Sequence, residues 1–182
     1  KPLAVLVNFT AHPTFMNQDD MLFSGDWPGH LQRTVESLVG EGVTAMYYNG
    51  AQGDQAPAGR GDAGNSRWER AERYGRDLGV VSWRQWQTTK TAADVPFAFH
   101  THSITLPERT WHPDFMKTGG AEYGLSETLF KEMLPVMFPT KADSLTLRLG
   151  DLLIVGIPGE MAASLGLRVK TESAKATGAK CP

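Results

Sequence analysis

Cysteine is nearly absent from this sequence, which has a single one, Cys181, in 182 residues. One thiol excludes an internal disulfide and a cysteine-rich zinc site, and it leaves the redox compartment open. An excess of charge of one sign is also lacking, because 18 Lys and Arg oppose 20 Asp and Glu. Since the basic residues are scattered, no patch predicts binding to nucleic acid or to an anionic membrane. A small molecule is the expected partner.

Long hydrophobic runs and several familiar catalytic motifs are missing as well. No apolar run approaches the roughly 20 residues that cross a bilayer, and the first residues lack the pattern of a signal peptide. There is no Gly-rich phosphate loop, no G-x-S-x-G elbow and no H-E-x-x-H helix. These absences argue against nucleotide-binding, α/β-hydrolase and thermolysin-like functions.

What is present suits an α/β domain, with 41% hydrophobic residues available for a core. Apolar runs at 3–9 and 43–48 predict strands, and the spacing of apolar residues over 28–40 predicts a helix between them. This order is typical of a βαβ-like unit, whose two parallel strands end at the same sheet edge.

The rest of the chain predicts more strands and helices. "VPFAFHTHSITLP" predicts a strand, and "SLTLRLGDLLIVGIPGE" predicts two strands around a turn, the second ending at Gly159 and Glu160. Helices are expected over 65–89, in "ETLFKEMLPVMF" and in "MAASLGLRVKTESAKA". We therefore expect one α/β domain over 1–182, with a mixed sheet and flanking helices. Because both ends of the sequence look cut, we expect a fragment of a larger catalytic domain.

Four chemistry-bearing residues each stand beside Gly or Pro where an apolar run gives way to a turn: His12, Asp26, Asp54 and Glu160. If the turns meet at one sheet edge, they supply nitrogen and oxygen ligands suited to zinc, with a position open to water. Glu160 has an alternative role, since a carboxylate in the first turn of a helix is stabilised by free N–H groups.

The loop "YYNGAQGDQAPAG" follows the second predicted strand. We expect Gly50 and Gly53 to take backbone conformations closed to other residues and Pro57 to set the exit direction, so that Asp54 is presented on a constrained turn. Loops of this kind often carry function, although an ordinary strand-to-helix connection has the same composition.

His100 and His102 form a second candidate for metal binding. Alternate residues on a strand point to the same face, so an H-x-H pair can chelate one ion. The alternative is a solvated pair on an exposed strand face. His112 and Asp114, in a polar loop, are a weaker candidate.

The order of four segments is more specific than any one of them: "NFTAHPT", "FSGDWPG", "NGAQGDQAP" and "GIPGEMAASLGLRV". Together they resemble the neutral/alkaline, non-lysosomal ceramidase family. In that family a strand ends in His-Pro-Thr, a Ser-(Gly/Ser)-Asp element and a Gly-Asp-x-Ser-Pro loop follow, and Pro-Gly-Glu introduces a helix. The resemblance implies part of the N-terminal catalytic domain of a hydrolase of sphingolipid metabolism, and favours a secreted or extracytoplasmic protein.

Carried over residue by residue, the resemblance implies that His12 and Glu160 are zinc ligands. A histidine of an earlier His-x-His element and a tyrosine after the Pro-Gly-Glu helix complete the site in the family, and both would lie outside this sequence. "HTHS" at 100–103 follows the Gly-Asp loop instead of preceding His12 and lacks the usual Gly-Pro. We therefore expect His100 and His102 on a strand away from His12, with no shared metal.

The sequence departs from the family at Ala56, which stands where the loop serine, the proposed nucleophile or transition-state contact, would be. A methyl group neither attacks nor donates a hydrogen bond. The expected function is a zinc-dependent hydrolase that cleaves an amide bond, in an N-acyl lipid or related substrate, through a metal-activated water.

The remaining site residues support this expected reaction. Asp54 would order the loop, and Asp26 would orient a ligand histidine by accepting its hydrogen bond. Second-shell or substrate contacts are expected from Asp26, Asn49, Gly53 and Pro57. Two alternatives stay open: a non-catalytic binding protein that lost the loop serine, and a hydrolase of the same fold with another amide or ester substrate.

Overall fold

The computed structural model describes residues 1–58, 66–107, 110 and 112–182. The chain folds as two compact units, the first formed by 1–95 and 160–177 and the second by 96–159 and 178–182. The single domain expected over 1–182 stays a prediction. None of the helices in the described residues is long and apolar enough to span a membrane.

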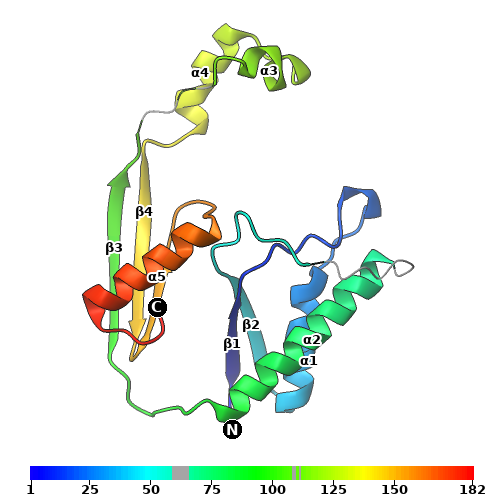
Figure 1. The fold of residues 1–182 in the computed structure, drawn as a ribbon, viewed down its shortest axis with the longest axis vertical. Coiled ribbons are helices and arrows are strands. Elements are labelled where there is room, and N and C mark those ends of the chain that lie inside the picture. The colour runs from blue at the N-terminus through cyan, green and yellow to red at the C-terminus, as the bar shows by residue number, and fades with distance from the viewer. Residues whose placement is uncertain (59–65, 108–109, 111) are drawn as a thin grey trace. The chain divides into compact units, whose positions relative to one another are not determined.

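The first unit contains the predicted βαβ arrangement (Figure 1). Strands β1 (Ala4–Phe9) and β2 (Thr44–Asn49) pair in parallel, from Ala4 opposite Thr44 to Phe9 opposite Asn49. Helix α1 (Asp26–Val39) connects them, after a short 3₁₀ helix η1 (Gln18–Asp20). Since the strands are parallel, the turns that follow β1 and β2 leave the same edge of the sheet.

An aromatic cluster lies between this edge and the helices. Trp27, at the start of α1, is fully buried and packs edge-to-face on Phe9, Tyr47 and Tyr74, with ring centroids 5.0–5.8 Å apart. Edge-to-face packing aligns the positive rim of one ring with the negative face of the next. The cluster therefore joins both strand ends to the first turn of α1.

Helix α2 (Arg67–Thr88) packs against α1 and begins with a capping box in which Ser66 and Glu69 exchange hydrogen bonds. Its position matches the prediction, but its buried face differs from a simple apolar stripe. Val81 is 58% exposed, whereas Gly75 and Gly79 are buried. Two glycines four residues apart let the helix backbones approach closely, so small residues fill the interface.

The second unit is an antiparallel sheet with a helical insertion. Strand β4 (Lys141–Leu149) lies between β3 (Phe97–Thr105) and β5 (Leu152–Gly156). Between β3 and β4 the chain forms η2 (Phe115–Lys117), α3 (Gly119–Glu122) and α4 (Glu127–Met137), where the rings of Phe115 and Phe130 stack.

The α/β class is confirmed, and the mixed sheet takes the form of two sheets in the described residues, one parallel and one antiparallel. One boundary was predicted wrongly. β5 ends at Gly156, and α5 (Ala163–Thr177) starts only at Ala163. Glu160 therefore lies in the connecting segment, outside the first turn of α5, because Pro158 and Gly159 break the strand before it.

Candidate functional site

His12 and Glu160 lie side by side in the first unit. The imidazole Nε2 of His12 is 3.0 Å from Oε1 of Glu160. The side chains are 29% and 60% exposed, so both remain open to solvent. Two residues from opposite ends of the chain thus present a nitrogen and an oxygen to the same point.

The backbone of His12 is held from two sides. Its N–H donates to the carbonyl oxygen of Gln55 at 2.9 Å, which ties the turn after β1 to the loop after β2. Its carbonyl oxygen accepts from the indole Nε1 of Trp27 at 3.1 Å. Because Trp27 is fully buried, this hydrogen bond fixes His12 relative to the core.

The segment that carries Glu160 is held by the same loop. The N–H of Gly53 donates to the carbonyl of Met161 at 2.8 Å, and the N–H of Ala163 donates to Oδ1 of Asp54 at 2.7 Å. The hydrogen bond from the Ala163 amide lowers the pKa of Asp54, and the hydrogen bond from the Gln55 side chain lowers it to a smaller extent. Asp54 therefore provides the carboxylate at the start of α5, a role that the sequence had left open for Glu160.

Gly50 and Gly53 serve close packing instead of unusual backbone angles. Neither is among the glycines with positive φ, so that part of the expectation was wrong. A Cβ added to Gly53 would lie 3.0 Å from the backbone of Met161, and one on Gly50 would overlap the Thr10 hydroxyl. Side chains are excluded here because neighbouring segments approach the loop.

Asp26 acts on His12 indirectly. Its buried carboxylate accepts from the N–H of Met16 at 2.7 Å and from the N–H of Trp27 at 2.6 Å. The hydrogen bonds of the described residues include none from the His12 imidazole to Asp26, and the expected role of Asp26 in orienting a ligand histidine stays a prediction. Both oxygens of Asp26 accept hydrogen bonds from backbone amides. Asp26 therefore restrains Trp27, whose indole N–H in turn donates to the His12 carbonyl.

Asn49 ends β2 beside the aromatic cluster. The Tyr47 hydroxyl contacts the side-chain oxygen of Asn49 and lies 3.0 Å from the Phe9 carbonyl. Burial raises the pKa of Tyr47, which keeps its hydroxyl protonated. Ala56 is exposed in the loop and Pro57 is partly buried, and the roles expected for these residues stay predictions.

His100 and His102 lie on β3, in the second unit, opposite Thr146 and Ser144. Both are exposed, as are His112 and Asp114, whose side chains are 3.8 Å apart. In the described part of the chain, no three or more His, Cys, Asp or Glu side chains gather as a metal site. The strand position of His100 and His102 is confirmed, and their separation from His12 stays a prediction.

The His12–Glu160 pair fits two positions of a zinc site. Ligands about 2.0–2.1 Å from a tetrahedral ion lie about 3.3 Å from one another, close to the observed 3.0 Å. An imidazole nitrogen and a carboxylate oxygen are both zinc donors. The other positions would need donors beyond the His, Cys, Asp and Glu side chains that the structure describes.

Comparison with known proteins identifies the fold. No family model matches the chain, and no curated protein does. Among solved structures, neutral ceramidase from Pseudomonas aeruginosa matches with a TM-score of 0.66 and 15% identity, over 97% of this chain and 35% of that one. A ceramidase complexed with C2 matches with a TM-score of 0.68 and 15% identity, over 98% and 38%.

The chain has the fold of part of a ceramidase. It spans 35% and 38% of the two matched structures, in agreement with the expected fragment of a larger domain. The similarity to ceramidases predicted from four short segments is thus confirmed for the fold.

Sequence reasoning missed three residues that hold the pair in place: Trp27, Gln55 and Ala163. Trp27 lies within the "FSGDWPG" segment, but nothing in its spacing indicates a hydrogen bond to the carbonyl of His12. Gln55 and Ala163 act through backbone groups, which every non-proline residue carries. The residue types at 55 and 163 therefore could not indicate that these positions hold the His12–Glu160 pair.

Proposed function

We propose that this chain belongs to a ceramidase-like, zinc-dependent hydrolase that cleaves an amide bond in an N-acyl lipid or a related substrate. The observation that carries the proposal is the 3.0 Å approach of His12 Nε2 to Glu160 Oε1. The ceramidase fold supports it, because the two residues occupy the His-Pro-Thr and Pro-Gly-Glu elements of the resemblance.

His12 and Glu160 would hold the metal through the imidazole nitrogen and the carboxylate oxygen. Bound zinc supplies a Lewis acid for the amide carbonyl and lowers the pKa of a coordinated water to about 7. The loop at 53–55 keeps both donors in place by its hydrogen bonds to His12, Met161 and Ala163. Positioning of this kind reduces the reorganisation needed at the reaction step.

Ala56 supports a water nucleophile over a protein nucleophile. Its methyl group offers no atom that attacks a carbonyl, and it is exposed in the loop beside Asp54. A hydrolase built on this loop would therefore use water as the attacking group.

A second candidate function is a non-catalytic binding protein that keeps the fold and the His12–Glu160 pair. Ala56 is the observation that favours it, because the position of the family serine carries no reactive group. A hydrolase with a different amide or ester substrate is the remaining alternative.

The test measures metal content and hydrolysis on the protein at its native length. We expect bound zinc, and hydrolysis of N-acyl sphingosines that is lost on chelation and restored by zinc. His12→Ala should remove both, whereas His112→Ala, at an exposed histidine in the other unit, should remove neither. The panel should include N-acyl amino sugars, peptides and simple esters. Bound zinc without hydrolysis of any substrate would favour the binding protein, and zinc content unaffected by His12→Ala would contradict the metal site.

A further inference from the structure

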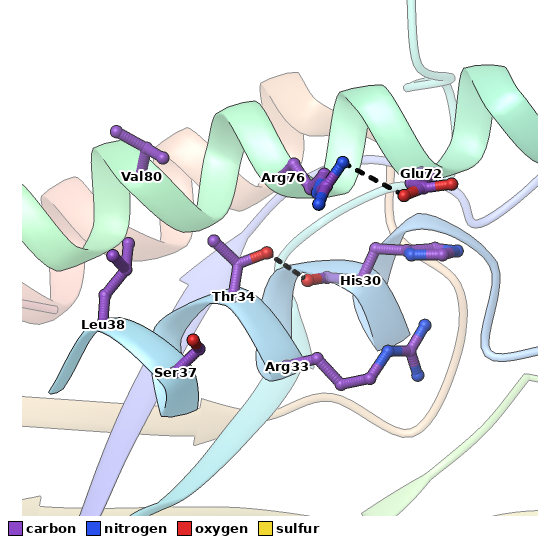
Figure 2. A pocket seen from close by; sticks show the side chains of 8 residues that line it. All are labelled: His30, Arg33, Thr34, Ser37, Leu38, Glu72, Arg76 and Val80. Atoms are coloured by element: carbon purple, nitrogen blue, oxygen red, sulfur yellow. Dashed lines mark hydrogen bonds and ion pairs between the residues drawn. The ribbon is translucent and has the colours of Figure 1, made fainter. Parts of the chain in front are cut away.

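A groove runs between α1 and α2 on the first unit, with a volume of about 370 Å³ (Figure 2). Neither His12 nor Glu160 lines it. The residues that line it come from both helices: His30, Arg33, Thr34, Ser37, Leu38, Glu72, Arg76 and Val80.

The groove has a charged end and an apolar end. Figure 2 shows the His30 ring and the Arg33 guanidinium together at one end, near Glu72, while Leu38 and Val80 lie at the other. Thr34 also lines the groove, and its hydroxyl donates to the carbonyl oxygen of His30 in its own helix, at 2.7 Å. A ligand with one charged end and one apolar end would match this division.

The two arginines of the charged end differ in their ion pairs. Arg76 Nη1 lies 3.2 Å from Glu72 Oε1, in an exposed pair. Arg33 has no carboxylate within ion-pair distance among the residues that the structure describes. Its guanidinium group is therefore available to an anion, and Glu72 competes with such an anion for Arg76.

The pKa of His30 depends on burial and on the charges at this end of the groove. Burial lowers the pKa of His30, the charges of Arg33 and Arg76 lower it further, and Glu72 and Asp26 oppose them. A bound anion would offset the two arginines and favour the protonated imidazole. His30 can then donate a hydrogen bond to the ligand.

We propose that this groove binds a phosphate monoester carried on an alkyl chain, with the phosphate between Arg33, Arg76 and His30 and the alkyl chain along Leu38 and Val80. Guanidinium groups bind phosphate oxygens through paired N–H donors. Two guanidinium groups and an imidazole match the three oxygens and double charge of phosphate better than the single charge of a carboxylate.

The test follows the imidazole resonances of His30 by NMR in the whole chain, with His30→Gln identifying the signal. Inorganic phosphate and hexyl phosphate are titrated at constant ionic strength. We expect saturable binding that raises the pKa of His30, with hexyl phosphate binding roughly tenfold more tightly because Leu38 and Val80 cover its methylene groups. Changes that sodium chloride reproduces at equal ionic strength would overturn the proposal.

Three variants on the two helices test the assignment of the groups. Arg33→Gln should weaken binding of hexyl phosphate at least fivefold, and Glu72→Gln should strengthen it, because Arg76 loses its competing carboxylate. Arg84→Gln, at an exposed position of α2 outside the groove, is the matched control and should change nothing. Equal effects of Arg33→Gln and Arg84→Gln, or weaker binding by Glu72→Gln, would overturn the proposal. Thermal unfolding of each variant shows whether the fold is intact.

The source of the phosphate is tested with vesicles. If the protein binds phosphatidylcholine vesicles that contain phosphatidic acid, and the Arg33→Gln variant does not, the phosphate that the groove binds is that of a lipid headgroup. Binding of hexyl phosphate in solution without vesicle binding would assign it to a soluble phosphate monoester. If hexanoate binds as tightly as hexyl phosphate, the preference for phosphate is wrong.

Discussion

At the scale of single residues, three consecutive positions align the candidate site. Gln55 accepts the hydrogen bond of His12, Gly53 donates to Met161, and Asp54 accepts from Ala163. Because both donors of the proposed metal site are tied to one short loop, their separation depends on that loop. Small displacements of it would change the distance between the donors and weaken the metal site.

Removal of a donor should have a larger effect than restoration of the loop serine. We expect His12→Ala to abolish zinc binding and hydrolysis, and Ala56→Ser to change kcat/KM only modestly, because the proposed nucleophile is water. Steady-state kinetics and metal analysis on the same preparations measure both. An inactive parent protein in which Ala56→Ser creates ceramide hydrolysis would contradict this prediction and point to a lost serine mechanism.

Asp54 should affect the metal through position alone. Asp54→Ala removes the acceptor for the Ala163 amide, so the segment of Glu160 should become less ordered and zinc affinity should fall roughly 10- to 100-fold. Competition with a chelator measures this affinity. Asp77→Ala, at an exposed position on α2, is the control that should leave it unchanged. An unchanged affinity in Asp54→Ala would show that the loop does not position Glu160.

The lowered pKa of Asp54 predicts an acid limit for this contact. A carboxyl group whose pKa is lower in the folded protein stabilises it above the unfolded pKa, about 3.9 for Asp, and loses this effect as the pH falls through the folded pKa. Protection of the Ala163 amide from hydrogen exchange should therefore persist to below about pH 3.9. Asp54→Asn should remove the pH-dependent step. A carboxyl resonance of Asp54 that titrates above the ordinary Asp range would disprove the assigned contact.

At the scale of elements, the crossing of α1 and α2 rests on two glycines. A Cβ on Gly75 would overlap the carbonyl oxygen of Trp27, and one on Gly79 would lie 2.6 Å from Cβ of Thr34. The close approach brings Trp27 and the first turn of α1 against α2. It therefore supports the residue that holds the His12 carbonyl, and it brings together the two helices whose side chains line the α1–α2 groove.

Gly75→Ala should destabilise the protein by about 1–3 kcal/mol, because the clash is with backbone and cannot be relieved by a side-chain rotation. Gly29→Ala is the matched control on α1. There the added Cβ would meet only the Arg33 guanidinium at 3.5 Å, so it should be neutral or stabilising by up to about 1 kcal/mol. Urea denaturation measures both, and equal stabilities would contradict the proposed close packing.

At the scale of the whole molecule, the fold covers part of the matched ceramidase structures, and the described residues offer two of the four expected zinc donors. We therefore expect residues 1–182 alone to bind zinc far more weakly than the protein at its native length, since protein zinc sites use three or four ligands. Chelator competition on both forms measures the difference. Equal affinities would mean that this chain holds further donors of its own.

Much of the fold was predictable because its signals are local. The strands at 4–9 and 44–49 follow from short apolar runs, and the helices from periodic apolar residues with turn residues at their ends. The glycines in the buried face of α2 were not predicted, because Gly75 and Gly79 contribute to packing through the absence of a side chain. A search for regularly spaced apolar side chains does not detect such glycines.

The sequence by itself determined most of the helices and strands, and it indicated the candidate donors and the similarity to the ceramidase fold, because turn residues and apolar periodicity act within a few neighbours. Only the tertiary structure decided that Asp54, instead of Glu160, receives the first amide of α5, across 109 residues. It also decided that Trp27 restrains His12 and that Arg33 and Arg76 line one groove. These contacts join segments far apart in the chain, often through backbone atoms that all residues share, so they arise only once the elements pack.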